Sequence, residues 1–409
     1  MRYRHVSVSV PALAESANLP HLLEMLRNQS VDCFSVYVCV NNPDEWSTGG
    51  DVKQRAMYAD NQSSLEILRI FADAHPQIDL TVIDRSSQGR GWSGKQRGVG
   101  MARKLLFECI ADKSDKDELI VSLDADTAVS SRYIESVLSA MNNNEDCSAL
   151  AVPYRHPLSG DERDDRAMLR YEIYMRHYLI NLLEIACRLK GRPRFPYAFT
   201  AIGSAMAFPL GAYLRVGGIT PLQGGEDFYL MQKFAKTGKV LLTCNEYVEP
   251  QGRQSLRVPF GTGPAVAKGV DSMQESYPLY PSEAFAAIEE SYSLFGQLYE
   301  SDIETAMSPF LRRQLRSEDL WGALRKNFRN RELFVHACQE RVDGLRILQF
   351  LKTYRCRPAD EEMVLFCNRH AIPIGDDFSF SASPIAEIDA IREALFRQER
   401  LLRKQYDAM

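Results

Sequence analysis

Two aspartates at the end of a predicted strand are the strongest chemical signal in the sequence. The apolar run at residues 118–123 predicts a buried strand, and Asp124 and Asp126 follow it, separated by Ala125. Because side chains alternate along a strand, both carboxylates should lie on the same side. Together they would offer oxygen ligands to a hard divalent cation, which can in turn hold a diphosphate. The structural alternative is an acidic turn in which Asp126 caps a helix.

A glycine-rich, basic segment at residues 88–100 is the second candidate site. Its glycines would let backbone amides approach a phosphate, Lys95 and Arg97 would neutralise its charge, and the amides of the helix that starts here would favour an anion. The segment is not a P-loop, because Gln96 stands where that motif needs a hydroxyl. The alternative is a surface loop with solvated cations.

A third signal is the pair Glu226 and Asp227, which follows two glycines and opens an amphipathic helix. Acids in the first turn of a helix complement its dipole without any further role. The functional interpretation is a carboxylate that acts as a general base at the edge of a pocket. The irregular, basic stretch at residues 250–263, which contains Arg253, is typical of a lid or binding loop.

Alternating strand and helix patterns should position these residues. The predicted strands are 6–10, 34–40, 79–84 and 119–123, and the predicted helices between them are 20–29, 63–74 and 94–110. Such alternation predicts an α/β fold in which helices cover both faces of a parallel sheet, with ligands bound beyond the carboxyl ends of the strands. Each candidate segment follows one of these strands, at residues 11–15, 41–44, 85–95 and 124–126.

The last part of the chain is predicted to be helical. Expected helices are 282–293, 303–316, 332–350, 360–370 and 385–404. We therefore expect an α/β domain at residues 1–265 and a helical domain at 281–409, which could form a homodimer or contact a membrane surface. A long amphipathic helix at 163–190 carries three tyrosines on one face, and packing against the sheet is favoured over stacking on a ligand.

Composition excludes several classes of function. The 409 residues are 45% hydrophobic and 25% charged, which is ordinary for a globular protein. A net charge of −5 argues against general nucleic-acid binding. No run approaches the roughly 18 apolar residues of a membrane span, and the first residues lack a signal-peptide pattern, so we expect a cytoplasmic protein. The nine scattered cysteines are expected to be reduced.

Taken in order, these motifs resemble those of family 2 glycosyltransferases with the GT-A fold, which transfer a sugar from a nucleoside-diphosphate donor with inversion. The resemblance covers residues 6–263 and implies a mixed sheet with helices on both faces. It implies that the domain at residues 1–265 is catalytic and that the helical domain at 281–409 could cover the acceptor side. It implies a donor site that includes Pro11, Ala12, Glu15, Asn41, Asn42, Lys95, Arg97, Asp124, Ala125 and Arg253. It also implies that Asp126, helped by Asp124, holds Mg²⁺ or Mn²⁺ on the diphosphate, and that Asp227, beside Glu226, is the catalytic base.

The sequence departs from the family pattern at two points. Asn41 and Asn42 replace the usual acid of the second turn, which leaves the base specificity open. No histidine lies between His177 and His336, so the metal would rest on Asp126, the diphosphate and water. The Gln-x-x-Arg-Trp signature of processive synthases is also absent, which favours a single addition of sugar.

Two other functions stay open at this point. A sugar-phosphate nucleotidyltransferase would use a similar metal site, but its basic glycine-rich loop should follow the first strand, where this chain has residues 11–15. A binding scaffold without turnover would keep the same fold, although the intact Asp124, Asp126 and Asp227 speak against it.

Overall fold

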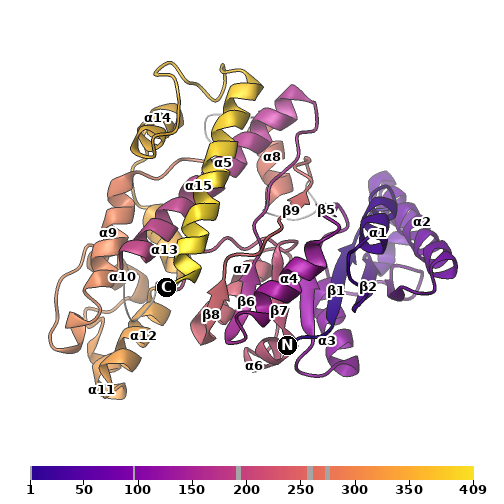
Figure 1. The fold of residues 1–409 in the computed structure, drawn as a ribbon, viewed down its shortest axis with the longest axis horizontal. Coiled ribbons are helices and arrows are strands. Elements are labelled where there is room, and N and C mark those ends of the chain that lie inside the picture. The colour runs from indigo at the N-terminus through magenta and orange to yellow at the C-terminus, as the bar shows by residue number, and fades with distance from the viewer. Residues whose placement is uncertain (1, 95–96, 190–194, 256–260, 272–276) are drawn as a thin grey trace. The chain divides into compact units, whose positions relative to one another are not determined.

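The computed structural model describes residues 2–94, 97–189, 195–255, 261–271 and 277–409. The chain divides into two units (Figure 1). The first unit contains residues 1–164 and 201–267, and the second contains 165–200 and 268–409. The predicted first domain, residues 1–265, includes residues 165–200, and its boundaries stay a prediction. By its contacts, the helix at residues 165–188 belongs with the second unit, where Arg176 pairs with Glu399 near the end of the chain.

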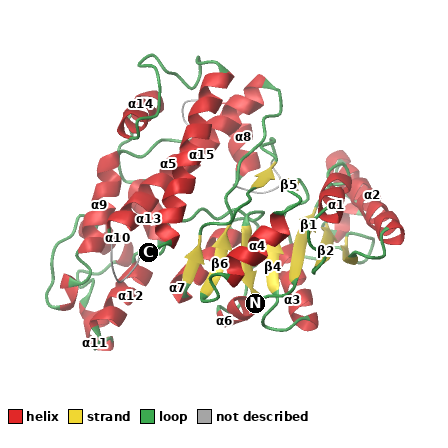
Figure 2. Ribbon diagram, viewed as in Figure 1, coloured by secondary structure: helices red, strands yellow, loops and turns green. Residues whose placement is uncertain are grey.

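A seven-stranded mixed sheet forms the centre of the first unit, in the order β3-β2-β1-β4-β7-β6-β8. Its strands are β1 Val6–Ala12, β2 Phe34–Asn41, β3 Asp79–Arg85, β4 Leu119–Ser122, β6 Cys147–Ala151, β7 Met206–Pro209 and β8 Lys239–Leu241. Strands β1 to β4 pair in parallel, as predicted, whereas β7 runs antiparallel to both β4 and β6. The predicted fold class, a mixed α/β sheet flanked by helices, is confirmed (Figure 2).

Strands β1, β2 and β4 are buried along their whole length. Every residue of β1, β2 and β4 is buried, with Val8 opposite both Val36 and Val121 in the register. Because both faces of the sheet are covered, the positions of β1 that alternate with valine hold the small buried side chains of Ser7 and Ser9 rather than charged residues. Strand β3 lies at the edge and is only partly buried. The parallel arrangement brings the carboxyl ends of β1, β2 and β4 to one edge of the sheet.

The helices and short strands of the first unit fill the connections. The helices are α1 Leu19–Arg27, α2 Val52–Ala74, α3 Val99–Lys113, α4 Tyr133–Asn142, α6 Leu210–Arg215, α7 Glu226–Thr237 and α8 Thr262–Asp271, with a 3-10 turn η1 at Asp44–Trp46. Helix α2 begins well before the predicted residue 63, because Asp51 and Gln54 form a capping box. Helix α3 begins later than predicted, because Gly98 takes a left-handed φ of 93°. A separate ribbon pairs β5 Thr127–Val129 with β9 Val248–Pro250.

The second unit is built from helices. They are α5 Glu162–Arg188, α9 Ser282–Ser293, α10 Ser308–Leu315, α11 Gly322–Asn327, α12 Arg331–Arg341, α13 Gly344–Leu351, α14 Ala359–Arg369 and α15 Ile385–Asp407, with a 3-10 turn η2 at Gln297–Tyr299. The single helix predicted at 332–350 is two helices, because Asp343 caps α13 and accepts a hydrogen bond from the backbone amide of Arg346.

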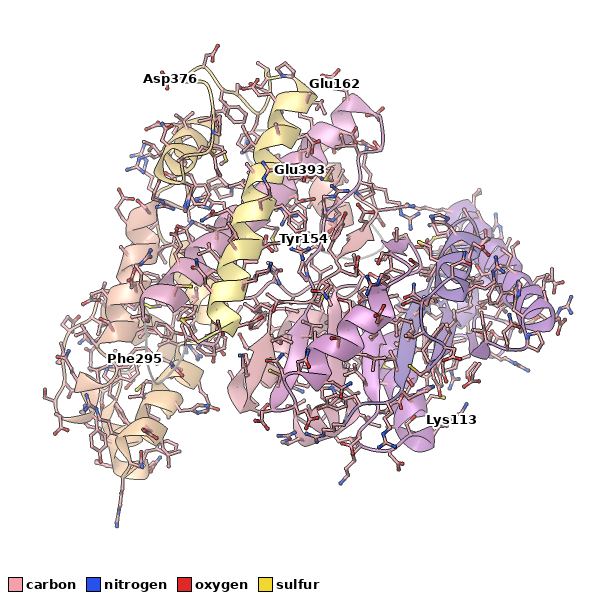
Figure 3. The ribbon with its side chains drawn as sticks, viewed as in Figure 1. Lys113, Tyr154, Glu162, Phe295, Asp376 and Glu393 are labelled. Carbon is pink, nitrogen blue, oxygen red and sulfur yellow. The ribbon has the colours of Figure 1, made fainter. Side chains whose placement is uncertain are left out.

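Helices α5 and α15 run beside each other in this unit (Figure 1). Buried ion pairs join them: Arg176 contacts Glu172 on its own helix and Glu399 on α15 at 2.6 Å. Aromatic side chains also pack within this unit: the ring centroids of Phe295 and Trp321 are 5.7 Å apart. Phe295 is labelled in Figure 3. Within the described part of the chain, no helix combines the length and apolar character that crossing a bilayer requires.

Candidate active site

Several predicted site residues lie at the carboxyl edge of the sheet in the first unit. Pro11 and Ala12 are the last residues of β1 and Asn41 is the last of β2, rather than parts of the loops that follow. Asp124, Ala125 and Asp126 connect β4 to β5. The sheet therefore delivers the three predicted donor segments to one edge, as expected for a parallel α/β arrangement.

Arg253 joins Asp126 to Glu15. Its Nη2 atom lies 2.9 Å from Asp126 Oδ2 and 2.6 Å from Glu15 Oε1. The β5–β9 ribbon positions this arginine, and the amide of Gln251 donates to the carbonyl of Asp126 at 3.3 Å. Burial alone would lower the pKa of Arg253, but the charges of Glu15 and Asp126 outweigh burial and raise that pKa. Three residues predicted from separate motifs therefore form one ion-pair cluster.

Arg103 on α3 forms a second cluster with Asp124 and Glu226. Its Nη2 atom lies 2.5 Å from Asp124 Oδ1, and its Nη1 atom pairs with Glu226 Oε1. The arginine side chain is 3% exposed. Burial would lower the pKa of Arg103, but the nearby carboxylates, first of all Asp124, raise it, so the side chain stays charged. The same guanidinium therefore pairs with Asp124 after β4 and with Glu226 in the first turn of α7.

None of the sequence motifs includes Arg103. Its position in the helical pattern could have identified it, because it lies on the face of α3 that also buries Ala102, Leu106 and Ile110. A charged residue on a buried helical face needs partners of opposite charge.

Asp227 is the accessible member of the acidic pair on α7. Glu226 is 2% exposed and is occupied by Arg103, whereas Asp227 is part exposed. The amide of Phe228 donates to Asp227 Oδ1 at 2.7 Å. Burial, followed by the negative charge of Glu226, raises the pKa of Asp227 to about 7. A carboxyl group with such a pKa is suited to accept a proton near neutral pH.

Asn41 and Asn42 use their side-chain amides inside the protein. Asn41 Nδ2 donates to the carbonyl of Ala12 at 2.9 Å, and Asn61 Nδ2 on α2 donates to Asn42 Oδ1 at 2.8 Å. Asn61 also accepts from the amide of Ala14 at 2.8 Å, where the backbone has a left-handed φ of 53°. These bonds fix the ends of β1 and β2. A contact between either asparagine and a nucleotide stays a prediction.

The glycine-rich segment is attached to the turn η1. Asp44 Oδ1 accepts hydrogen bonds from the amides of Gly89 at 2.7 Å and Gly91 at 3.2 Å. A Cβ on Gly91 would lie 2.6 Å from the Cα of Asp44, so only glycine fits there. Arg97 Nη1 pairs with Glu45 Oε1 at 2.9 Å. Lys95, the other predicted cation, lies outside the described residues.

The predicted metal site consists of Asp126 and Asp124, which lie in the connection between β4 and β5. Among the described residues, no three His, Cys, Asp or Glu side chains gather as metal ligands. Asp124 and Asp126 are each paired with an arginine. A divalent ion on Asp126 would therefore take its other ligands from a diphosphate and water. Mg²⁺ is commonly bound in this way, through one or two carboxylates and substrate phosphates, so the donor set fits.

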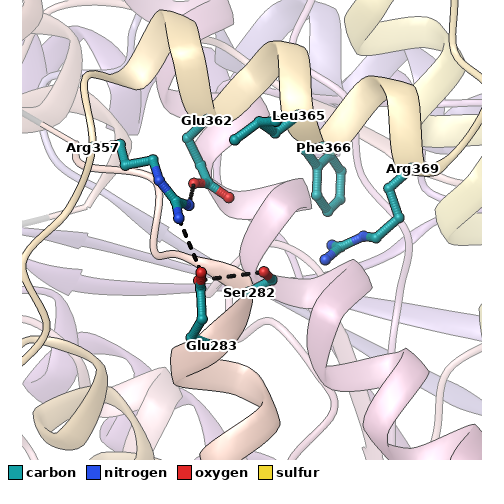
Figure 4. Close-up of a pocket in the computed structure, with 7 residues that line it drawn as sticks. All are labelled: Ser282, Glu283, Arg357, Glu362, Leu365, Phe366 and Arg369. Atoms are coloured by element: carbon teal, nitrogen blue, oxygen red, sulfur yellow. Dashed lines mark hydrogen bonds and ion pairs between the residues drawn. The ribbon is translucent and has the colours of Figure 1, made fainter.

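A separate pocket of about 310 Å³ lies in the helical unit (Figure 4). Its lining residues are Ser282, Glu283, Arg357, Glu362, Leu365, Phe366 and Arg369. Arg357 is paired with Glu283 and with Glu362, both at 2.9 Å, and Arg369 Nη2 donates to Asn181 at 2.8 Å. The pocket contains none of the predicted site residues.

Comparison with known proteins gave weak structural likenesses. No protein-family model matches the chain, and no curated protein sequence matches it. S. aureus TarS 1–349 in complex with UDP is 13% identical, covering 93% of this chain and 98% of that chain with a TM-score of 0.39. Mannosyltransferase PcManGT from Pyrobaculum calidifontis, in complex with GDP-Man and Mn²⁺, is 15% identical, with coverage of 95% and 86% and a TM-score of 0.38.

Glucosyl-3-phosphoglycerate synthase from Mycobacterium tuberculosis, in complex with Mn²⁺, UDP and glucosyl-3-phosphoglycerate, is 17% identical. It covers 58% of this chain and 69% of that chain, with a TM-score of 0.33. The likeness to glycosyltransferases that the motifs predicted is thus found among solved structures, whereas membership of family 2 stays a prediction. At these scores the likenesses carry no argument about chemistry, which has to come from the site itself.

Proposed function

We propose that this chain is a glycosyltransferase that moves a sugar from a nucleoside-diphosphate donor to an acceptor hydroxyl. One observation carries the proposal: Arg103 contacts both Asp124, from the strand-end acidic motif, and Glu226, the neighbour of Asp227. The two motifs are far apart in the sequence, yet they share one buried cation. A donor-binding segment and a base are thereby adjacent, as transfer to a hydroxyl requires.

The donor side of the proposed site consists of Asp126, Glu15 and Arg253. Mg²⁺ or Mn²⁺, when bound on Asp126, would offset the charge that develops on the departing diphosphate. Arg253 lies against Asp126 and would add a second positive charge beside the same oxygens. Arg97 lies in the glycine-rich segment at the same edge of the sheet, and we assign it and Lys95 to the nucleotide.

The acceptor side centres on Asp227. Its carboxylate would take the proton of the acceptor hydroxyl as that oxygen attacks the anomeric carbon from the side opposite the diphosphate, which inverts the configuration. The raised pKa makes Asp227 a stronger base than an ordinary aspartate. Glu226 is buried against Arg103 and has no access to an acceptor. A single addition of sugar, a cytoplasmic location and a homodimer through the helical unit complete the proposal.

The nucleotidyltransferase alternative is less consistent with the first loop. That activity needs cations after β1, but this chain has Ala14 in a strained conformation and the buried Glu15 there. A non-catalytic scaffold is distinguished only by turnover.

A thermal-shift panel tests the donor assignment. Melting temperatures are measured with UDP, GDP, dTDP, CDP and ADP, with and without Mn²⁺, because a ligand that binds only the folded state raises the melting temperature. We expect one nucleotide to stabilise the protein in the presence of Mn²⁺, and Asp126→Asn to lose that effect. Absence of any shift with all five nucleotides would contradict the donor site.

Turnover with the sugar nucleotide of the selected base then tests the catalytic assignment. Asp227→Asn should keep the thermal shift and lose about 10²–10⁴-fold in rate. Asp112→Asn, at an exposed position near the end of α3, is the matched control and should retain activity. Unchanged turnover in Asp227→Asn would remove Asp227 from the mechanism.

A further inference from the structure

Arg103 connects the two halves of the proposed site. Its two terminal nitrogens contact two different carboxylates, one after β4 and one in the first turn of α7. All three side chains belong to the first unit, and the guanidinium and Glu226 are almost fully buried. A permanently charged, planar guanidinium can hold two carboxylates at fixed positions, which a lysine ammonium does less well.

The surroundings of Arg103 are shaped around it. Gly203 lies against the guanidinium, and a Cβ at that position would overlap its terminal nitrogens. The Nε atom of Arg103 is buried and has no hydrogen-bond partner among the described residues. The side chain is therefore held by its two ion pairs and by the space that Gly203 leaves.

We propose that Arg103 is a positioning residue that fixes the start of α7 against the end of β4. This inference rests on the proposed function, in which Asp227 is the base. Consecutive residues of a helix point in directions about 100° apart, since 3.6 residues make one turn. Because Arg103 holds Glu226 in the core, the next side chain, Asp227, is directed toward the partly exposed edge. Arg103 thereby sets the distance from the base to the donor without contacting substrate.

Four variants test this role. Arg103→Lys keeps the charge but reaches only one carboxylate at a time, and Gly203→Ala displaces the guanidinium without changing any charge. Glu226→Gln removes one partner. Lys104→Gln is the control, because Lys104 is the next residue on α3, carries the same charge and is partly exposed. It should behave as wild type.

We expect these variants to lower kcat while they leave the affinity for the nucleoside diphosphate nearly unchanged. Arg103→Lys should lower kcat about 10²-fold, since a displacement of about 1 Å can have that effect. The dissociation constant of the nucleoside diphosphate with Mn²⁺ should change less than tenfold, because Asp126 is intact. Gly203→Ala should also lower kcat, because it displaces the same guanidinium. A kcat within threefold of wild type in both Arg103→Lys and Gly203→Ala would overturn the proposal.

A double-mutant cycle tests whether Arg103 acts through Glu226. If it does, Arg103→Lys combined with Glu226→Gln should lose no more kcat than the worse single variant. Independent roles predict that the two losses multiply, and that outcome would contradict a shared action.

A structural readout separates this inference from the proposed function. Crystal structures of wild type and Arg103→Lys should differ by about 1 Å in the position of the Asp227 carboxyl group relative to Asp124. This comparison needs no turnover, so it holds even where no sugar nucleotide is a substrate. An unchanged Asp227 position would overturn the positioning role. A displaced Asp227 in a protein without transferase activity would support it and would refute only the proposed reaction.

Discussion

Asp227 should set the acid limb of the pH–rate profile. Its pKa is raised from 3.8 to about 7, first by burial and then by the charge of Glu226, whereas Arg103 acts in the opposite direction. Because kcat/KM reports the ionisation of the free enzyme, its profile should fall below an apparent pKa near this value. With a base of pKa about 7, kcat/KM should be about half of its high-pH plateau value at pH 7 and about a tenth of that value at pH 6. An ordinary aspartate would leave both points on the plateau.

The perturbation that tests the cause is Glu226→Gln. It removes the negative neighbour of Asp227 and also releases Arg103 from one of its two partners, and both changes favour the ionised carboxylate. A neighbouring charge within a few ångströms shifts a carboxyl pKa by about one to three units, and the partial exposure of Asp227 favours the lower end. We therefore expect the acid limb of the kcat/KM profile to shift to a lower pH by about one unit in Glu226→Gln. The plateau of this variant will also be lower, so the position of the limb is the quantity to compare.

The assay is kcat/KM from pH 5 to 9 at constant ionic strength and fixed Mn²⁺. Glu108→Gln, an exposed glutamate on α3, is the control and should leave the limb in place. A wild-type limb below pH 5 would refute the role assigned to Asp227 or its surroundings. A limb that stays in place in Glu226→Gln would show that burial alone sets the pKa.

Three further predictions do not depend on turnover. Because the folded-state pKa of Asp227 is raised, folding disfavours its charge, and this penalty is absent below about pH 4, grows as the pH rises and is complete above about pH 7. Asp227→Asn should therefore melt higher than wild type at pH 8, with the difference shrinking toward pH 5, and equal melting temperatures at pH 8 would contradict the shift. Asn61→Ala should cost about 2 kcal/mol or more in urea unfolding, because it leaves the buried Oδ1 of Asn42 without its donor and the part-buried amide of Ala14 without its acceptor. Arg253→Gln should strengthen Mn²⁺ binding to the nucleotide-free protein, measured by the thermal shift with Mn²⁺ alone, because a competing cation leaves Asp126.

The sequence predicted the first four strands well because short runs rich in valine, isoleucine and leucine, alternating with serine in β1, are typical of strands. The later strands escaped prediction because β5, β8 and β9 have three residues each, too few for a pattern. The helix at 163–190 was recognised from its period, but periodicity does not reveal the partner. Its assignment to the helical unit depends on contacts such as Arg176 with Glu399, which join residues far apart in the chain.

In the candidate site, too, the residues that belong to local sequence motifs were predicted, whereas a residue that depends on contacts between distant segments was not. Strand ends and residue types pointed to Asp124, Asp126 and Asp227, since these signals are local. Arg103 was not found, because its function depends on two partners that only the fold brings together. Asn41 is predicted to contact the nucleotide from its place at a strand end, and this stays a prediction; the structure adds that its amide nitrogen donates to the carbonyl of Ala12 in β1. A polar residue at a strand end can complete the sheet as well as bind a ligand.

Charge in the site gives a physical reason to expect metal and nucleotide to bind together. The two ion-pair clusters, together with Asp227, contribute five carboxyl groups and two guanidinium groups, from Glu15, Asp124, Asp126, Glu226, Asp227, Arg103 and Arg253. A nucleoside diphosphate would bring further negative charge to a site that already has an excess of it. Binding therefore needs an added cation, while a cation alone competes with Arg253 for Asp126. The cation offsets the negative charge that opposes nucleotide binding, and the diphosphate supplies ligands that help the cation to compete with Arg253. The thermal shift with a nucleotide should therefore depend on the metal.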